Sequence, residues 1–167
     1  SVSRRTYEEA ADALGWDIAG LCFGDDERLN LTEYTQPCIL TTEIAMLRGL
    51  NSLYNFVPSI FGGHSLGEFT ALVAAGALPL TEAVRIVHIR GQLMQKAVPV
   101  GEGSMAAVIS QHIDMEVLRN AIADIPIDVA NINSAHQVVI SGAASAFPET
   151  EARLRAAFVH DPGFRFV

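Results

Sequence analysis

The sequence has little positive charge, few cysteines and no long apolar run. Its 167 residues include 11 lysines and arginines against 19 acidic residues, a formal net charge of −8. Nucleic-acid backbones are bound by clusters of basic side chains, so this balance argues against a nucleic-acid partner. No run approaches the roughly 18 apolar residues of a membrane span. The N-terminal SVSRRTYEEA also lacks the apolar core of a signal peptide. We therefore expect no membrane partner and a cytoplasmic location.

The two cysteines, Cys22 and Cys38, both stand in apolar surroundings. Two cysteines are too few for the disulfide framework of a small secreted protein. We interpret them as buried thiols in a reducing cytoplasm rather than as a metal-binding or redox pair, and the sequence predicts no metal site.

Half of the residues are hydrophobic, which is enough for one domain or two small ones with real cores. The first hundred residues alternate helical periodicity with polar loops. Thr6 and Glu9 form a capping-box pattern for a helix that ends at Gly15. Further elements are expected as a helix from about residue 35, a buried strand at 59–61, and helices from behind Ser65 to about residue 76 and at 81–97.

The sequence pattern changes at the Gly- and Pro-containing stretch Pro99-Val100-Gly101-Glu102-Gly103. We interpret this stretch as a flexible joint between a domain at 1–99 and one at 100–167. Beyond it, short elements follow in the order β-α-β-β-α-β, typical of a ferredoxin-like module. They are expected at 104–110, 114–123, 127–132, 137–141, 144–158 and 164–167.

The stretch FGGHSLGEF, residues 61–69, places one serine between two glycines. A strand, then Gly-His-Ser-Leu-Gly, then a helix is the context of a nucleophile elbow. Side chains at Gly63 and Gly67 would collide with nearby backbone, and Ser65 would sit at the tip of the turn. The backbone N–H of Leu66, at the start of the helix, would then face a developing oxyanion. A chance match to so short a motif is the alternative, and the motif alone does not separate acyl transfer from ester cleavage.

The residues around this serine resemble a known family. GGHSLGEFTALVAAGALPLTEAVRIVHIRGQLMQKAVPVGEGSMAAVI, YTQPCILTTEIAMLRGL and NINSAHQVVISG are similar to the malonyl-CoA:acyl-carrier-protein transacylases and to the acyltransferase domains of polyketide synthases. The resemblance implies an α/β fold, in which part of an α/β-hydrolase-like large subdomain carries a ferredoxin-like small one.

The resemblance also implies a reaction. A serine takes malonyl from coenzyme A, and the phosphopantetheine thiol of an acyl carrier protein removes it, in fatty acid or polyketide synthesis. Malonyl-CoA and the carrier protein are the implied partners. No metal or redox cofactor is implied, since the coenzyme A thioester is a substrate.

Three residues match the family's functional positions. Ser65 matches the nucleophile, Leu66 the oxyanion-hole donor, and Arg90 the arginine that binds the free carboxylate of malonyl. A guanidinium offers a carboxylate two parallel N–H donors, which lysine cannot. A surface arginine paired with an acid is the alternative for Arg90. His64 is interpreted as structural, because adjacent residues on a sharp turn point apart.

Two parts of the family pattern have no match, a Gly-Gln-Gly-Ser-Gln-like loop and the general-base histidine. The chain therefore resembles an internal segment, and we expect no histidine within hydrogen-bonding reach of Ser65 and weak activity from the segment alone. Leucine at position 66 fits members that take malonyl, whereas glutamine resembles those that take methylmalonyl. A hydrolase acting on acyl carrier proteins, or a non-catalytic segment that pairs with a complementing chain, stay open as alternatives.

Overall fold

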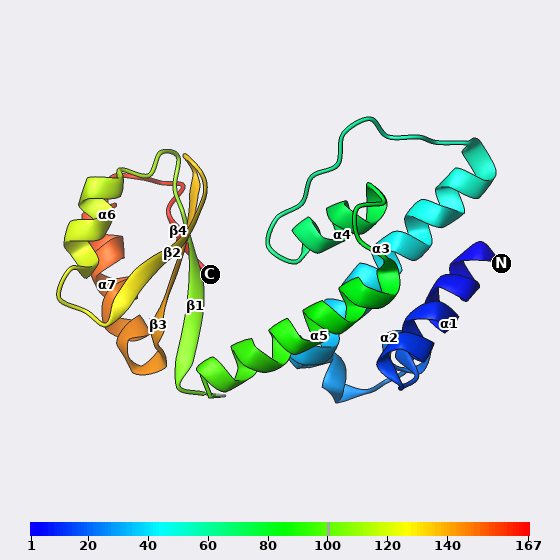
Figure 1. Ribbon diagram of the computed structural model, residues 1–167. Helices are drawn as coiled ribbons and strands as arrows, with labels where there is room; N and C mark the ends of the chain where they lie inside the picture. The colour runs from blue at the N-terminus through cyan, green and yellow to red at the C-terminus, as the bar shows by residue number, and fades with distance from the viewer. Residues whose placement is uncertain (100) are drawn as a thin grey trace. The chain divides into compact units, whose positions relative to one another are not determined.

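A computed structural model of the chain describes residues 1–99 and 101–167 (Figure 1). The chain divides into two compact units, Ser1–Ala97 and Val98–Val167. The boundary predicted between residues 99 and 100 falls at Val100, which lies outside the described residues. Within the described residues, helices and one four-stranded sheet give a mixed α/β architecture, as expected at that level. Among the described helices, none combines the length and apolar character needed to cross a lipid bilayer.

The described part of the first unit is built from helices. Three of them, α1, α3 and α5, pack on one another, and α4 follows a long irregular segment (Figure 1). In chain order the elements are α1 (Val2–Leu14), α2 (Ile18–Phe23), the 3-10 helix η1 (Glu27–Asn30), α3 (Thr32–Tyr54), α4 (Gly67–Ala74) and α5 (Leu80–Ala97).

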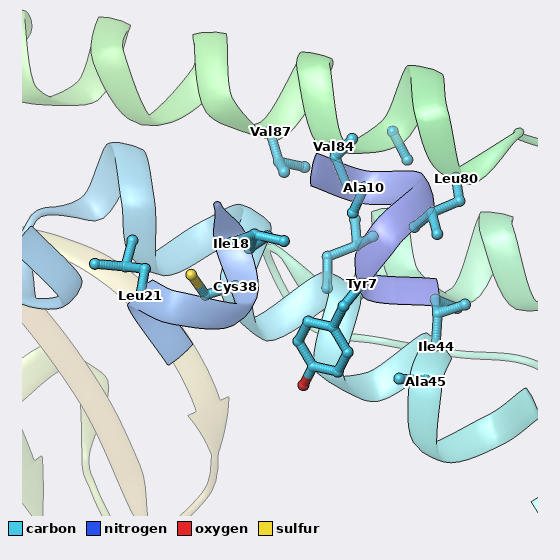
Figure 2. Packing of buried hydrophobic residues seen from close by; sticks show 12 residues of the cluster. Tyr7, Ala10, Ile18, Leu21, Cys38, Ile44, Ala45, Leu80, Val84 and Val87 are labelled. Carbon is cyan, nitrogen blue, oxygen red and sulfur yellow. The ribbon is translucent and has the colours of Figure 1, made fainter. Parts of the chain in front are cut away.

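The core of this unit lies where α1, α2, α3 and α5 meet, as Figure 2 shows. Apolar side chains recur at helical spacing on the inner face of each helix and are almost fully buried there. Burying such a side chain stabilises the fold by about 1.5–3 kcal/mol. The largest fully buried side chains of this core include Ile18, Leu40, Leu80, Val84 and Val87.

The capping box predicted at Thr6 is wrong, because the N-cap of α1 lies five residues earlier, at Ser1. Ser1 is the N-cap, and its hydroxyl accepts a hydrogen bond from the backbone N–H of Arg4. Thr6 lies inside the helix and is fully buried, and Glu9 pairs with Arg48 of α3 at 2.6 Å. The predicted end is confirmed, since Gly15 has the left-handed φ of 77° that a terminal glycine adopts easily.

The strand predicted at residues 59–61 is also wrong. Between α3 and α4 the backbone is irregular, and Ile60 is 89% exposed. An isolated strand has nowhere to direct its backbone hydrogen bonds, and the described part of this unit offers no neighbouring strand. The apolar pattern was therefore insufficient to make a strand here.

The second unit is a sheet with two helices. The four strands are antiparallel to their neighbours in the order β2-β3-β1-β4. The two helices α6 and α7 lie together on one side of the sheet (Figure 1). The elements are β1 (Gly103–Ile109), α6 (Met115–Ile122), β2 (Ile127–Ser134), β3 (Gln137–Ala143), the 3-10 helix η2 (Ala144–Ala146), α7 (Phe147–Ala157) and β4 (Arg165–Phe166).

The β-α-β-β-α-β order expected from the sequence is the order observed, with shifted ends. β2 runs two residues further than predicted, so that the turn before β3 is shorter, and β4 is only two residues long. Val129 pairs with Ile140, as expected for this hairpin. Val138 and Ile140 point into the core, where they meet Leu118 of α6 and Leu154 of α7.

Candidate active site

Ser65 has the strained backbone expected of a nucleophile elbow. Its φ is +55°, a left-handed conformation that side chains other than glycine rarely adopt. Such outliers persist only where surrounding structure holds them, and they gather at functional sites. The turn closes through a hydrogen bond of 2.9 Å from the N–H of Gly67 to the carbonyl of His64. The serine therefore stands at the tip of a tight turn.

The two glycines that flank the serine differ in their roles. A Cβ atom at Gly63 would lie 2.0 Å from the carbonyl oxygen of Gly67, so this position requires glycine. A Cβ at Gly67 would meet nothing within 4 Å in the described chain, so the predicted collision is wrong there. The close approach of the two backbones shapes the turn, and only the first glycine is needed for it.

Leu66 precedes the first residue of α4 and has helical φ and ψ angles. Within the described residues its backbone N–H has no hydrogen-bond acceptor, as is usual for the first N–H groups of a helix. It is thus a free donor adjacent to Ser65. Glu68 occupies the first turn of the same helix, where an acidic side chain complements the helix dipole.

Arg90 of α5 reaches the serine. Its Nη2 donates a hydrogen bond of 3.0 Å to Ser65 Oγ, and its Nη1 donates one of 2.5 Å to Oε1 of Gln36. The guanidinium carbon also lies 5.9 Å from the centre of the Phe69 ring. None of the ion pairs found in the described chain includes Arg90, so the alternative of a surface arginine paired with an acid is not what is observed.

The packing of α5 on α3 positions Arg90. A Cβ at Gly91 would lie 2.4 Å from Cα of Glu33, so glycine lets the two helices approach closely. Pro37 has no N–H for the carbonyl of Glu33, four residues earlier. His88 Nδ1 donates a hydrogen bond of 2.8 Å to that carbonyl instead. The residues on either side of Arg90 therefore fix the helix from which it projects.

Gln36 is a candidate site residue that the sequence reasoning missed. It is only 5% exposed, and its Nε2 donates a hydrogen bond of 2.8 Å to Thr32 Oγ1. This bond turns its carbonyl oxygen toward Arg90. A signal was present, because Gln36 precedes Leu40 and Ile44 at intervals of four and so shares their buried helix face. A buried amide on an apolar stripe needs partners.

The histidines do not serve the serine directly. In residues 1–99 and 101–167, the side-chain hydrogen bond to Ser65 Oγ comes from Arg90, and no histidine nitrogen makes one. His64 is exposed on the turn, and His88 is engaged with α3. The arrangement thus combines an exposed hydroxyl, a free backbone donor and a guanidinium, without a base bonded to the serine.

A pocket of about 570 Å³ lies beside the turn. Most of its lining is apolar, and Glu43 of α3 accepts a hydrogen bond of 2.6 Å from Thr70 of α4 at its wall. It is lined from α3 by Ile39, Glu43 and Leu47, from the irregular segment by residues 58 and 60–64, and from the turn and α4 by Leu66, Gly67, Thr70, Ala71 and Ala74.

Comparison with known proteins matches residues 2–160 to the family described as acyl transferase domain. The chain belongs to this family. Among curated members, it is 40% identical over 158 residues to the malonyl CoA-acyl carrier protein transacylase of Haemophilus influenzae, covering 91% of this chain and 50% of that protein. It is 42% identical over 148 residues to the Bacillus subtilis protein of the same name, covering 85% of this chain and 46% of that protein.

Solved structures of the family have the same fold. An acyl carrier protein S-malonyltransferase from Vibrio cholerae superposes with a TM-score of 0.84 at 36% identity, over 99% of this chain and 55% of that one. A malonyl-transacylase in complex with its type II PKS acyl-carrier protein gives 0.86 at 36% identity, over 99% and 54%. The chain spans about half the length of the curated acyl transferases that it matches.

Proposed function

We propose that the protein is a malonyl-CoA:acyl-carrier-protein transacylase and that this chain carries its nucleophile and its carboxylate-binding arginine. The observation that supports this most directly is the 3.0 Å contact between Arg90 and Ser65 Oγ on a strained turn. A hydroxyl and a guanidinium in contact suit an acyl group that ends in a carboxylate. The names of the relatives, all malonyl transacylases, support the same substrate.

In the proposed first step, Ser65 Oγ attacks the thioester carbonyl of malonyl-CoA and coenzyme A leaves as the thiol. The N–H of Leu66 donates to the oxyanion that forms, a contribution typically worth 10²–10³-fold in rate. Arg90 exchanges its contact with the hydroxyl for two parallel hydrogen bonds to the malonyl carboxylate when malonyl-CoA binds, before this attack. In the second step the phosphopantetheine thiol of an acyl carrier protein attacks the seryl ester and regenerates Ser65.

The mechanism requires a base that removes the serine proton, which typically contributes 10²–10⁴-fold. None of the hydrogen bonds to Ser65 in the described chain comes from such a group. We expect a histidine from elsewhere in the protein to take this role. Arg90 contributes by favouring negative charge on Ser65 Oγ as the proton leaves.

We also propose that the two units correspond to an α/β-hydrolase-like large subdomain, in part, and a ferredoxin-like small subdomain. The β2-β3-β1-β4 order and the two helices support the second assignment. For the first, the support is the elbow and the likeness of the whole chain to the family structures. Fatty acid or polyketide synthesis is the proposed context, with malonyl-CoA and an acyl carrier protein as partners in the cytoplasm.

The deciding experiment uses the complete protein and measures acyl transfer from malonyl-CoA and from acetyl-CoA. Incubation with malonyl-CoA should add one malonyl group to the peptide that contains Ser65, and Ser65→Ala should abolish the adduct. Arg90→Ala should lower the preference for malonyl over acetyl roughly tenfold or more, since a charge-assisted contact contributes about 1.5–3 kcal/mol. An adduct that survives Ser65→Ala, or an equal loss for both acyl groups in Arg90→Ala, would contradict the assignment.

A further inference from the structure

The two cysteines are brought together in the fold. Cys22 lies near the end of α2 and Cys38 in the second turn of α3, and both line one pocket of about 240 Å³. Leu29, Ile39, Thr42 and Glu43 complete its lining. Cys22 is half-buried, whereas Cys38 is 3% exposed and belongs to the core in which Leu21 of α2 also packs (Figure 2). The sequence analysis weighed a redox pair and preferred two buried thiols, and it gave no sign that both cysteines line one pocket.

Their surroundings make the two thiols chemically unequal. The neighbouring Cys38 thiol and, to a smaller extent, the Thr42 hydroxyl lower the pKa of Cys22, although burial acts to raise it. The Cys22 thiol and then burial raise the pKa of Cys38. A partly accessible thiol with a lowered pKa, beside a more deeply buried thiol, is typical of cysteines that react with oxidants.

The pair has too few neighbours of the right kind for a metal site. In the described chain no group of three or more histidines, cysteines or acidic residues could hold a metal ion. A structural zinc site takes four such ligands. Reaction of the thiols with each other is therefore the better-supported chemistry.

We propose that Cys22 and Cys38 form a redox-reactive pair, which a hydroperoxide converts to an intramolecular disulfide that joins α2 to α3. The Cys22 thiolate attacks the outer oxygen of the hydroperoxide, the O–O bond breaks, and an alcohol or water leaves with a proton. The Cys38 sulfur then attacks the resulting sulfenic acid at sulfur, and the S–O bond breaks with release of water. Two thiols give up two electrons and two protons, and the hydroperoxide is reduced.

The test is direct mapping of the purified full-length protein after brief treatment with hydrogen peroxide. Free thiols are blocked, and the protein is digested without reduction. We expect a mass loss of about 2 Da per oxidised chain, a Cys22–Cys38 linked peptide, and recovery of both thiols with dithiothreitol. Two free thiols after treatment, or a disulfide formed only between chains, would overturn the proposal.

Single substitutions separate the two roles. In Cys38→Ser the reaction should stop at the sulfenic acid of Cys22, which dimedone captures as a stable adduct. In Cys22→Ser the buried Cys38 should remain a thiol under the same treatment. Equal dimedone labelling of the two variants would contradict the assigned order of attack. Circular dichroism identifies a variant that fails to fold, and the mapping of the wild-type protein then decides alone. None of these readouts depends on the proposed acyl transfer.

Discussion

The two units differ in how completely they bury their own apolar surface. In the second unit every strand pairs within the sheet, and the helices cover a core that includes the fully buried Leu118 and Leu154. In the first unit the helices share a core, yet the segment after α3 leaves Val57 80% and Ile60 89% exposed. The candidate nucleophile follows this segment. The second unit, with its closed core, therefore has the more regular structure, and the candidate site lies in the less regular first unit.

Exposed apolar side chains of this kind are typical of surfaces that contact another polypeptide. Leu53 and Tyr54, at the end of α3, are also apolar and exposed. Together with Val57 and Ile60 they form a series of side chains that are each more than 70% exposed. Contacts with another polypeptide would order such a segment. The conformation of the strained turn at Ser65 would then depend on those contacts, whereas the second unit is held by its own core.

The largest expected effect tests the closed core of the second unit. Leu154→Ala removes a fully buried side chain where α7 meets the sheet and should lower the free energy of unfolding by about 2–5 kcal/mol. Urea unfolding measures the loss, and hydrogen exchange should show it in β1, β3 and α6 rather than in α1 and α3. The control Val159→Ala, at a side chain 67% exposed, should change stability by less than about 0.5 kcal/mol. Equal deprotection of the helices of both units would contradict this separation.

The next effect concerns the turn in the first unit. In Gly63→Ala the added Cβ would lie 2.0 Å from the carbonyl oxygen of Gly67, so the turn must open and Ser65 must move. A displacement of about 1 Å can cost roughly 10²-fold in rate. We expect acylation of Ser65 by malonyl-CoA to slow by about that factor.

Gly62→Ala is the matched control, because its Cβ would meet nothing within 4 Å in the described chain. Its acylation rate should stay close to that of the wild type. If both variants lost activity equally, flexibility of the segment, rather than the close approach of Gly63 to Gly67, would be the important property.

The same contrast explains what could be predicted from the sequence. In the second unit each strand and helix has its own periodicity and its partners lie nearby in the chain, so the order of elements was predicted correctly. In the first unit the strand predicted at 59–61 had an apolar pattern but no strand beside it. The start of α3 was misplaced because Pro37 lies inside the helix, where His88 compensates for the missing hydrogen bond.

The candidate site was predictable where a motif marks it. Ser65 and Leu66 lie in the Gly-His-Ser-Leu-Gly motif, and Arg90 was proposed from the family resemblance. Their roles remain predictions, although the contact between Ser65 and Arg90 is present in the structure. Gln36 was missed because its role depends on a contact between α3 and α5, which no local pattern reports.

A smaller effect tests that contact. Gln36→Leu keeps the bulk of the side chain but removes the acceptor of the Arg90 Nη1 hydrogen bond. A hydrogen bond to a charged group contributes about 1.5–3 kcal/mol, and water can replace part of it. We expect the preference for malonyl over acetyl to fall roughly tenfold, through KM for malonyl-CoA more than through kcat. Gln95→Leu on α5 is the control, since its side chain forms no hydrogen bond in the described structure. A loss of stability with unchanged selectivity would show that Gln36 serves packing alone.

The smallest effect returns to the second unit, where Asp161 joins the end of β1 to the turn before β4. Its carboxylate accepts hydrogen bonds from the Ser110 hydroxyl, from the N–H of Gln111 at 2.8 Å and from that of Gly163 at 2.7 Å. The Ser110 hydrogen bond is the main cause that lowers the pKa of Asp161 below its ordinary value of 3.8. The folded state therefore binds this proton more weakly than the unfolded chain does.

A carboxylate with a depressed pKa stabilises the fold above its ordinary value, and the contribution disappears as the pH falls through the folded-state pKa. Asp161→Asn should lower the urea midpoint at pH 7, and the gap to the wild type should narrow as the pH falls below 3.8. Asp128→Asn, at an exposed position of β2, provides the control for the loss of one negative charge. If the difference in urea midpoint between Asp161→Asn and the wild type stayed constant from neutral to acid pH, the negative charge of Asp161 would not be what stabilises the fold. Such a result would leave the closed core, rather than this polar contact, as the reason why the second unit is regular.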